Sequence, residues 1–261
     1  MKILAIGDLH GKIPKGLPEK DIDLIILTGD LGKADLMRKM CFENVNRKKG
    51  GIEERVWTPL QKKNAFIQAY DSTIKILERL RKTAPIYLVY GNVESGDKKT
   101  KELSKEIKIK LPFLGKKLKS MKGILNIGGK KKSNAKFSIA GYSYFVETDW
   151  VERFEKNDDE SLLSSVKGDL KAKKWFGKLK KVDIILTHNP PYGVLDKVNF
   201  PSAPKDWQNK KAGSKYLLNY IKRKQPRYAI CGHIHEGAGE RMVGKTKVIN
   251  LGCGNWKVLD L

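Results

Sequence analysis

Short runs of branched apolar residues recur along the chain, and each run ends abruptly at a polar residue or at glycine. Their length and composition predict five buried strands, at residues 2–7, 22–28, 85–90, 182–187 and 227–231. Between several of them, apolar residues recur at helical spacing, which predicts helices at 59–82, 160–180 and 213–224. Strands that alternate with helices are typical of βαβ units with right-handed crossovers, so we expect an α/β fold.

Three further segments depart from this alternation. Residues 121–146 and the tail 240–261 have the pattern of hairpins, so we expect strands of both directions in the sheet structure. Residues 33–58 are polar and irregular, and we expect an insertion or cap there. The chain shows no internal repeat and no convincing linker, so we expect residues 1–261 to form a single domain.

Composition narrows the class of protein. Apolar residues make up 40% of the 261 residues, which is enough for a sizeable core and excludes a disordered tail. No apolar run reaches the roughly 18 residues of a transmembrane helix, and the apolar N-terminal stretch ends at Asp8, too short for a signal peptide. Cys41, Cys231 and Cys253 lack the spacing of a zinc site or a redox pair. We therefore expect a cytoplasmic protein that makes no membrane contact.

The chain is strongly basic, with 53 Lys and Arg against 29 Asp and Glu and a net charge of +24. Residues 97–136 alone hold 14 lysines against three acids. A surface that binds nucleic acid or another polyanion would explain this excess. A general bias toward lysine would explain it equally, and adaptation to heat is one cause of such a bias.

The candidate chemistry lies at the ends of the predicted strands. All four histidines follow such a strand, and so do two aspartates and an asparagine. The seven side chains are Asp8, His10, Asp30, Asn92, His188, His233 and His235. Ligands of open α/β sheets bind at the carboxyl ends of the strands. Carboxylates and imidazoles suit divalent Mn, Fe, Co, Ni or Zn, so we predict a metal site formed by these residues.

The order of these residues carries a resemblance. Asp8-x-His10, Gly29-Asp30, Gly91-Asn92-x-Glu94, His188 and Gly232-His233-x-His235 together resemble the calcineurin-like metallophosphoesterase superfamily. Residues 187–193 and 231–236 are similar to its compact, phosphodiesterase-like branch. The resemblance implies a four-layer αββα sandwich of two mixed β-sheets flanked by helices. It also implies two divalent metal ions, with manganese as the first expectation.

The resemblance further implies a role for each side chain. It places Asp8, His10 and His235 on one metal, Asn92, His188 and His233 on the other, and Asp30 between the two. We predict that a hydroxide bridging the metals attacks phosphorus. Asp30 and Asn92 would then be catalytic residues, and Asn92 and Tyr192 would contact the substrate.

One position departs from the family pattern. Many members have a histidine after the Gly-Asn pair, where it assists the leaving group, but this chain has Val93. Valine donates no proton, and loss of general-acid help costs about 10²–10⁴-fold for a poor leaving group. Glu94 is either a substitute acid or, as we favour, a residue that orients a metal ligand.

We therefore expect a metal-dependent phosphoesterase, most simply a phosphodiesterase that acts on nucleotides or other small phosphate esters. One alternative is a nuclease or end-phosphatase with the same site, which the basic surface would favour. The other is an interaction module on this fold without catalysis. The sequence does not specify the oligomeric state.

Overall fold

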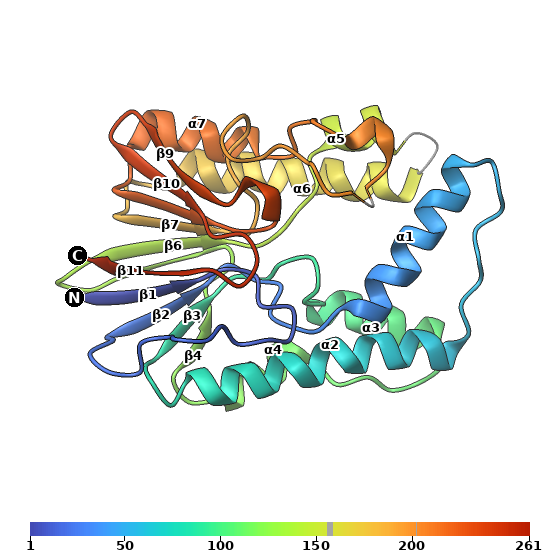
Figure 1. The fold of residues 1–261 in the computed structure, drawn as a ribbon, viewed down its shortest axis with the longest axis horizontal. Helices are drawn as coiled ribbons and strands as arrows, with labels where there is room; N and C mark the ends of the chain where they lie inside the picture. Colours follow the sequence, from blue (N-terminus) through green and yellow to red (C-terminus); the bar gives the residue numbers. More distant parts are fainter. Residues whose placement is uncertain (156–158, 202) are drawn as a thin grey trace.

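Two mixed β-sheets pack face to face in the computed structural model, which describes residues 1–155, 159–201 and 203–261 (Figure 1). The five-stranded sheet has the order β11-β1-β2-β3-β4, with β1 (Lys2–Ile6), β2 (Leu24–Leu27), β3 (Ile86–Leu88), β4 (Ile124–Asn126) and β11 (Trp256–Asp260). The six-stranded sheet has the order β5-β6-β7-β8-β10-β9, with β5 (Lys130–Ser133), β6 (Ser138–Tyr142), β7 (Ile184–Thr187), β8 (Tyr228–Cys231), β9 (Gly239–Val243) and β10 (Thr246–Asn250).

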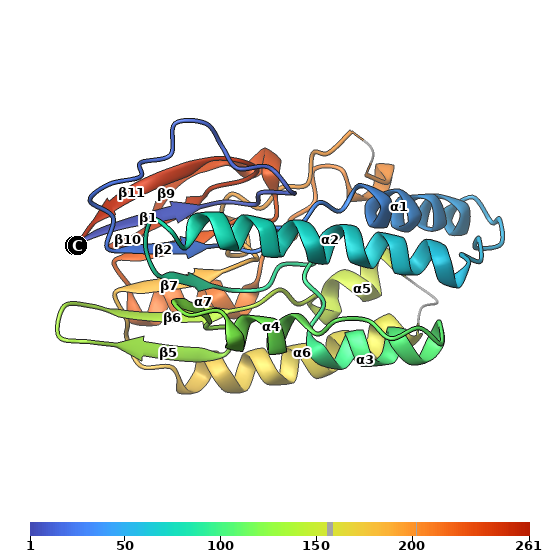
Figure 2. The ribbon, with the colours of Figure 1, turned by 90° about the horizontal axis from the view of Figure 1, so that it is seen from below.

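Helices cover the outer face of each sheet. The five-stranded sheet is covered by α2 (Pro59–Leu80) and α4 (Leu114–Ser120), and α3 (Asp97–Glu106) lies beside them beyond the strand ends (Figure 2). On the opposite side of the molecule lie α5 (Thr148–Phe154), α6 (Asp159–Lys178) and α7 (Lys215–Lys224). The remaining helix, α1 (Asp35–Lys49), stands beyond the ends of the strands (Figure 1). The expected four-layer αββα sandwich is confirmed.

Burial on both faces explains the sequence of the central strands. Ile3 and Ile26 pack between the sheets against Ile184, while their neighbours Leu4 and Ile25 pack under the outer helices. A strand with two buried faces needs apolar side chains at successive positions rather than at alternate ones. Strands β1 to β4 are parallel to one another, and so are β6, β7, β8 and β10. Because parallel strands end at the same side of a sheet, their carboxyl ends lie at one edge of the molecule.

The predicted hairpins are only partly correct. Residues 121–146 do not form one hairpin, because β4 pairs with β3 in the first sheet and only β5 and β6 pair as antiparallel neighbours. In the tail, β9 and β10 form a hairpin, whereas β11 crosses to the other sheet and pairs with β1. Local pattern does not reveal these exchanges, because each strand presents apolar residues to whichever sheet it joins.

The segment predicted as irregular contains a helix. α1 extends from Asp35 to Lys49, and none of its residues is fully buried. Its sequence lacks the continuous apolar stripe of a core helix, which is why the pattern indicated irregular structure. Among the described residues, no helix is both long and apolar enough to span a membrane.

Candidate metal centre

The strand ends bring all seven predicted side chains to one place, at the seam between the two sheets. Four come from the five-stranded sheet: Asp8 and His10 follow β1, Asp30 follows β2, and Asn92 follows β3. The six-stranded sheet contributes the other three, with His188 after β7 and His233 and His235 after β8. The site is thus assembled from both halves of the chain.

One group of these side chains surrounds the carboxylate of Asp8, which is fully buried. The Thr28 hydroxyl donates to its Oδ1 at 2.8 Å, and the backbone N–H of His233 donates to its Oδ2 at 2.7 Å. His235 Nε2 lies 3.3 Å from the same Oδ2 and 3.2 Å from Nε2 of His10. Two imidazole nitrogens and a carboxylate oxygen therefore face one another across a short gap.

A second group surrounds Asn92. Its Oδ1 lies 3.1 Å from His188 Nε2 and 3.1 Å from His233 Nδ1. His188 Nδ1 lies 2.9 Å from the carbonyl oxygen of Thr28, which can only accept, so Nδ1 carries the proton. In the neutral ring, Nε2 then presents its lone pair toward Asn92. Lone pairs that converge in this way suit a cation better than they suit one another.

Asp30 lies between the two groups. One of its oxygens is 3.8 Å from His10 Nε2, and the other is 3.7 Å from His188 Nε2. The backbone N–H of Val93 donates to Oδ1 at 2.8 Å and fixes the orientation of the carboxylate. Ligand atoms of Asp8, His10 and Asp30 all lie within 4.8 Å of one another, which is close enough to share ions.

The backbone is strained at three of these positions. His10, Asp30 and His233 have φ values of 43°, 48° and 68°, in the left-handed region that side chains other than glycine rarely adopt. Such conformations cost about 1–3 kcal/mol each and persist only where the surrounding structure fixes them. They cluster at functional sites, and here they direct three polar side chains into one space.

Two glycines allow the strand ends to approach one another. A Cβ on Gly91 would lie 2.2 Å from Oδ1 of Asp30, and a Cβ on Gly232 would lie 2.2 Å from Oδ1 of Asp8. Any side chain at either position would displace a carboxylate of the site. Gly91 and Gly232 therefore permit a close approach of the strand ends that no larger residue would allow.

The electrostatics of the site favour a bound cation. Burial and the nearby charge of Asp8 raise the pKa of Asp30 to about 8. Burial also opposes the charge on Asp8, but His188 and His235 lower the pKa of Asp8 below its usual value. Burial lowers the pKa of His10 to about 4 and that of His233 to about 3. The imidazoles of His10 and His233 are therefore neutral at pH 7, with lone pairs available to a metal. A cation would also relieve the repulsion between the carboxylates of Asp8 and Asp30.

Glu94 is buried and supports the backbone of the site. It accepts hydrogen bonds from the N–H groups of Asp30, Leu31 and Gly91 at 2.8, 2.7 and 2.9 Å. Burial and the charge of Asp30 raise its pKa to about 7. With both oxygens engaged by backbone amides, Glu94 fixes the loops that carry Asp30 and Asn92, in keeping with the orienting role that we favour.

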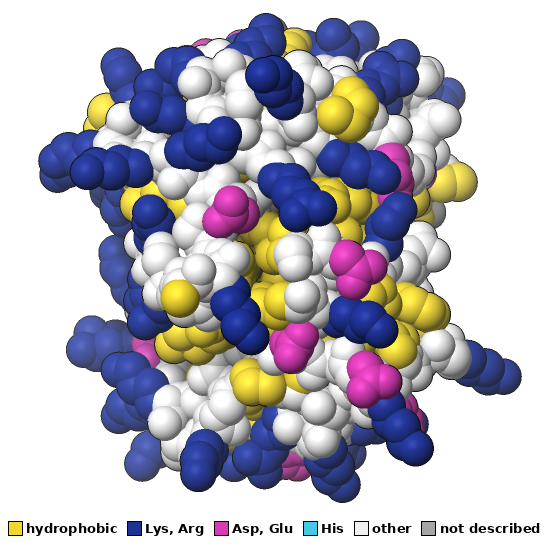
Figure 3. Space-filling model, turned by 90° about the vertical axis from the view of Figure 1, so that its left-hand side faces the viewer, with side chains coloured by type: hydrophobic (Ala, Val, Ile, Leu, Met, Phe, Trp, Pro, Cys, Tyr) yellow, Lys and Arg dark blue, Asp and Glu magenta, His cyan; other side chains and the backbone are white. Residues whose placement is uncertain are grey.

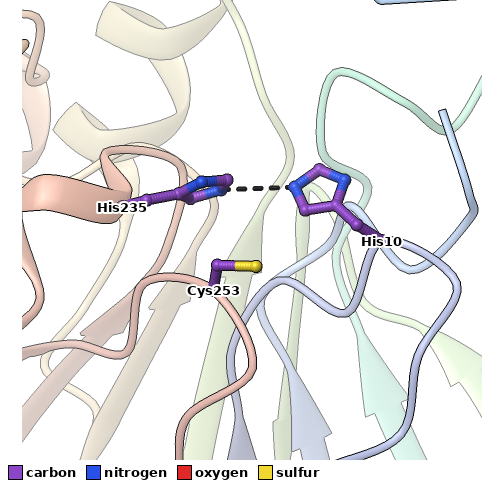
Figure 4. Close-up of side chains that lie close together, drawn as sticks. All are labelled: His10, His235 and Cys253. Atoms are coloured by element: carbon purple, nitrogen blue, oxygen red, sulfur yellow. Dashed lines mark hydrogen bonds between the residues drawn. The ribbon is translucent and has the colours of Figure 1, made fainter. Parts of the chain in front are cut away.

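Two side chains near the site are not among the predicted ligands or substrate contacts. The thiol of Cys253 lies within 4.8 Å of ligand nitrogens of His10 and His235 and sits beside both rings (Figure 4). Burial raises its pKa above the usual value. The ring of Tyr144 packs 5.5 Å from that of His188 and 4.9 Å from that of His233. Cys253 follows β10, so the rule that selected the other strand-end residues could also have selected it.

The metal centre opens into a cavity of about 570 Å³. His10, Asp30, Asn92, His233 and His235 contribute to its lining, and so does Tyr192, the predicted substrate contact. α1 and the segments that follow β6 and β7 contribute its remaining walls. A cavity of this size beside a metal cluster is typical of a small-molecule site.

The fold and this cluster define an αββα protein with a candidate metal centre at the seam of its sheets. The chain belongs to the calcineurin-like phosphoesterase family, whose sequence profile matches residues 1–237. Within 85 residues it is 41% identical to metallophosphoesterase domain-containing protein 1 of Homo sapiens, a match that covers 32% of this chain and 24% of the human protein. The chain thus spans about a quarter of that relative.

Two further comparisons extend over nearly the whole chain. An uncharacterized protein of Methanocaldococcus jannaschii, MJ1162, is 24% identical over 269 residues, covering 100% of this chain and 92% of that protein. The solved structure of a phosphopantetheinyl hydrolase from Mycobacterium tuberculosis is similar with a TM-score of 0.52 and 11% identity, covering 97% of this chain and 89% of that chain. At this low sequence identity, the structural likeness shows a shared fold and nothing more.

Proposed function

We propose that this protein is a dinuclear metal-dependent phosphoesterase that cleaves diesters among small phosphate esters. The supporting observation is the convergence of carboxylate, amide and imidazole atoms from both sheets at one place on the seam between them. The chemistry of this donor set fits divalent metals of the Mn–Zn series, and we propose manganese as the native ion.

The proposed ligands fall into the two groups described above. Asp8, His10 and His235 would hold one ion, Asn92, His188 and His233 would hold the other, and Asp30 lies between the two groups. Two divalent ions would supply Lewis-acid activation of a water molecule and of the phosphoryl group.

The chain's own groups then position the ester. Asn92 lines the cavity, so its amide can donate a hydrogen bond to a non-bridging phosphoryl oxygen. During hydrolysis, the oxygen of water bonds to phosphorus, the ester P–O bond breaks, and the departing oxygen takes its proton from solvent. Val93 cannot supply that proton, so esters with acidic leaving groups, such as aryl oxides, should react fastest.

The distribution of positive charge favours a small ester over nucleic acid. Among the described residues that line the cavity, Arg38 and Lys211 are the only two cations, although the chain has 53. Lysine and arginine side chains are abundant on the face shown in Figure 3, the end of the molecule where the chain termini lie. A nuclease needs cations beside its reacting phosphate, because phosphate contacts supply most of its affinity.

The experiment is a metal-reconstitution assay. Metal-stripped protein is reloaded with Mn²⁺ and assayed on bis-p-nitrophenyl phosphate and p-nitrophenyl phosphate, and bound metal is measured by elemental analysis. We expect two ions per chain and faster turnover of the diester, with both lost in His188→Ala.

Each other outcome revises a defined part of the proposal. Faster turnover of the monoester would keep the metal centre and make the protein a phosphomonoesterase. Two bound ions without turnover of either ester, with Ni, Co, Zn and Fe also tried, would refute the proposal for small esters. Hydrolysis of DNA or RNA that falls steeply with added salt would replace it with a nuclease.

A further inference from the structure

The cavity beside the metal centre has an apolar chamber that phosphate chemistry does not require. Two phosphoryl oxygens and a water molecule would occupy only the space next to the ligands. The cavity extends beyond them to about 570 Å³, and most of the residues around the extension are apolar or aromatic. Something other than phosphate must account for the size and character of this space.

One wall of the chamber is a single face of α1. The cavity is lined by Ala34, Met37, Arg38, Cys41, Phe42 and Val45. These positions follow the spacing i, i+3, i+4, i+7, i+8 and i+11, which places them on one side of a helix. The apolar side of α1 therefore faces the cavity rather than the core, and this accounts for a helix in which no residue is fully buried.

The opposite wall comes from the second half of the chain. The ring of Phe200 lies 5.9 Å from that of Phe42 and 5.4 Å from the guanidinium of Arg38. Trp207 lies 5.4 Å from Trp150, and both line the cavity. Aromatic contacts thus connect the two walls and leave a space with apolar sides between them.

Two acidic side chains of the chamber are engaged with neighbouring parts of the chain. Oε1 of Glu147 accepts from the backbone N–H of Lys215 at 2.7 Å, and Asp149 pairs with Arg153 at 3.1 Å. Val93, at the position where many family members have histidine, packs with Ala34 and Ala69 and so adds to the apolar lining. The chamber therefore presents more apolar surface than charge to a ligand.

We propose that this chamber binds an apolar ester group of the substrate, of about the size of an octyl chain, while the phosphate lies at the metal centre. The inference rests on the proposed phosphoesterase activity and narrows its substrate to amphiphilic phosphodiesters. Each methylene that leaves water contributes about 0.8 kcal/mol, which corresponds to a gain of up to about fourfold in kcat/KM. A nucleoside would place part of its polar surface against this mainly apolar lining.

A homologous series of esters tests the proposal. Manganese-loaded protein is assayed on p-nitrophenyl phosphodiesters whose second ester group is methyl, butyl or octyl, each below its micelle concentration. We expect kcat/KM to rise at least about tenfold from methyl to octyl. Equal values across the series would overturn the chamber while leaving the phosphoesterase in place.

A binding measurement separates the two proposals fully. Trp150 and Trp207 line the chamber, so tryptophan fluorescence reports on its occupancy. Octylphosphonate, which is not hydrolysed, should change the emission in a saturable way, whereas methylphosphonate at equal concentration should not. This result would support the chamber even if every ester proved inert. Equal responses to both phosphonates would refute it.

Matched variants locate the effect on the helix. Val45→Asp places a charge on the chamber side of α1, and Val56→Asp makes the same change at a side chain that is 89% exposed. We expect Val45→Asp to lower the octyl-to-methyl ratio of kcat/KM at least fivefold and Val56→Asp to leave it unchanged. Val45→Thr, nearly equal in size to valine, should lower the ratio less and guards against misfolding of the aspartate variant. An unchanged ratio in both Val45 variants would overturn the proposal.

Discussion

The cavity has a floor and a roof, and they are built in different ways. The floor is the candidate metal centre, whose seven side chains follow parallel strands and five of which line the cavity. The roof is α1 together with residues 198–201 and 203–207, joined through a few side-chain contacts. Strands buried on both faces fix the floor, whereas no residue of α1 is fully buried. Chemistry that a family shares can thus stay on the rigid part, while selectivity lies on the part that is easier to change.

The largest effect should follow from a change in the floor. Asp30→Asn removes the negative charge from the residue between the two ligand groups, and we expect bis-p-nitrophenyl phosphate turnover to fall by at least about 10²–10³-fold. Elemental analysis should show fewer than two bound ions. Asp35→Asn, the same substitution at a side chain that is 68% exposed, is the control and should change neither quantity. If Asp30→Asn kept its full metal content and activity, the proposed role of Asp30 between the two ions would be wrong.

A smaller effect should follow from a change beneath the floor. Glu94→Gln leaves one acceptor oxygen for three backbone N–H groups, so the loops that carry Asp30 and Asn92 would lose part of their support. We expect metal affinity, measured by titration with Mn²⁺, to fall about 10–100-fold. Activity at saturating metal should largely recover. Activity that stays lost with both ions bound would instead make Glu94 the proton donor that Val93 cannot be.

Glu147, which lines the cavity between the floor and the roof, should make the stability of the protein depend on pH. Burial raises the pKa of Glu147 from 4.5 to about 7, so the folded state binds more protons than the unfolded state between these values. The free energy of unfolding should therefore fall by about 2 kcal/mol as pH rises from about 4.5 to 7. Glu147→Gln should lack this component in urea denaturation, while Glu152→Gln, at an exposed position, should retain it. Identical pH profiles for Glu147→Gln and the unmodified protein would refute the assignment.

The smallest effect belongs to the roof. Lys49 Nζ lies 2.6 Å from Asp206, and this ion pair connects α1 with the opposite wall. Both side chains are partly exposed, so Lys49→Ala should cost at most about 1 kcal/mol. Hydrogen exchange of the α1 amides should become up to about fivefold faster. Lys39→Ala, on the exposed side of the same helix, should have no such effect. Equal hydrogen-exchange rates in the two variants would mean that the Lys49–Asp206 ion pair does not hold α1 against the opposite wall.

The sequence predicted the floor better than the roof. Local pattern alone predicts the five strands and the helices over 59–82, 160–180 and 213–224. It also places Asp8, Asp30 and His188 at strand ends, because a strand buried on both faces must be apolar and ends at the first polar residue. The same reasoning could not place β4 or β11, since pairing with β3 and β1 depends on distant parts of the chain.

The roof escaped prediction for a different reason. The apolar positions of α1, such as Met37, Phe42 and Val45, do have helical spacing, but charged residues outnumber them in the segment. A helix that faces a cavity needs fewer apolar residues than one that faces the core, so its pattern is weaker. Cys253 was not predicted as a ligand because the tail 240–261 was predicted only as a hairpin, without the bounds of β10.

The seam position of the candidate metal centre would have a consequence for the lifetime of the protein. His10 and His235 are 225 positions apart in the chain, yet their Nε2 atoms lie 3.2 Å apart, one from each sheet. A cation held between them acts as a reversible cross-link between the halves of the molecule, stabilising the folded state in proportion to its occupancy. The supply of metal would then determine how often the two sheets separate and become open to proteolysis. A shortage of the ion would shorten the lifetime of the protein and also lower its activity.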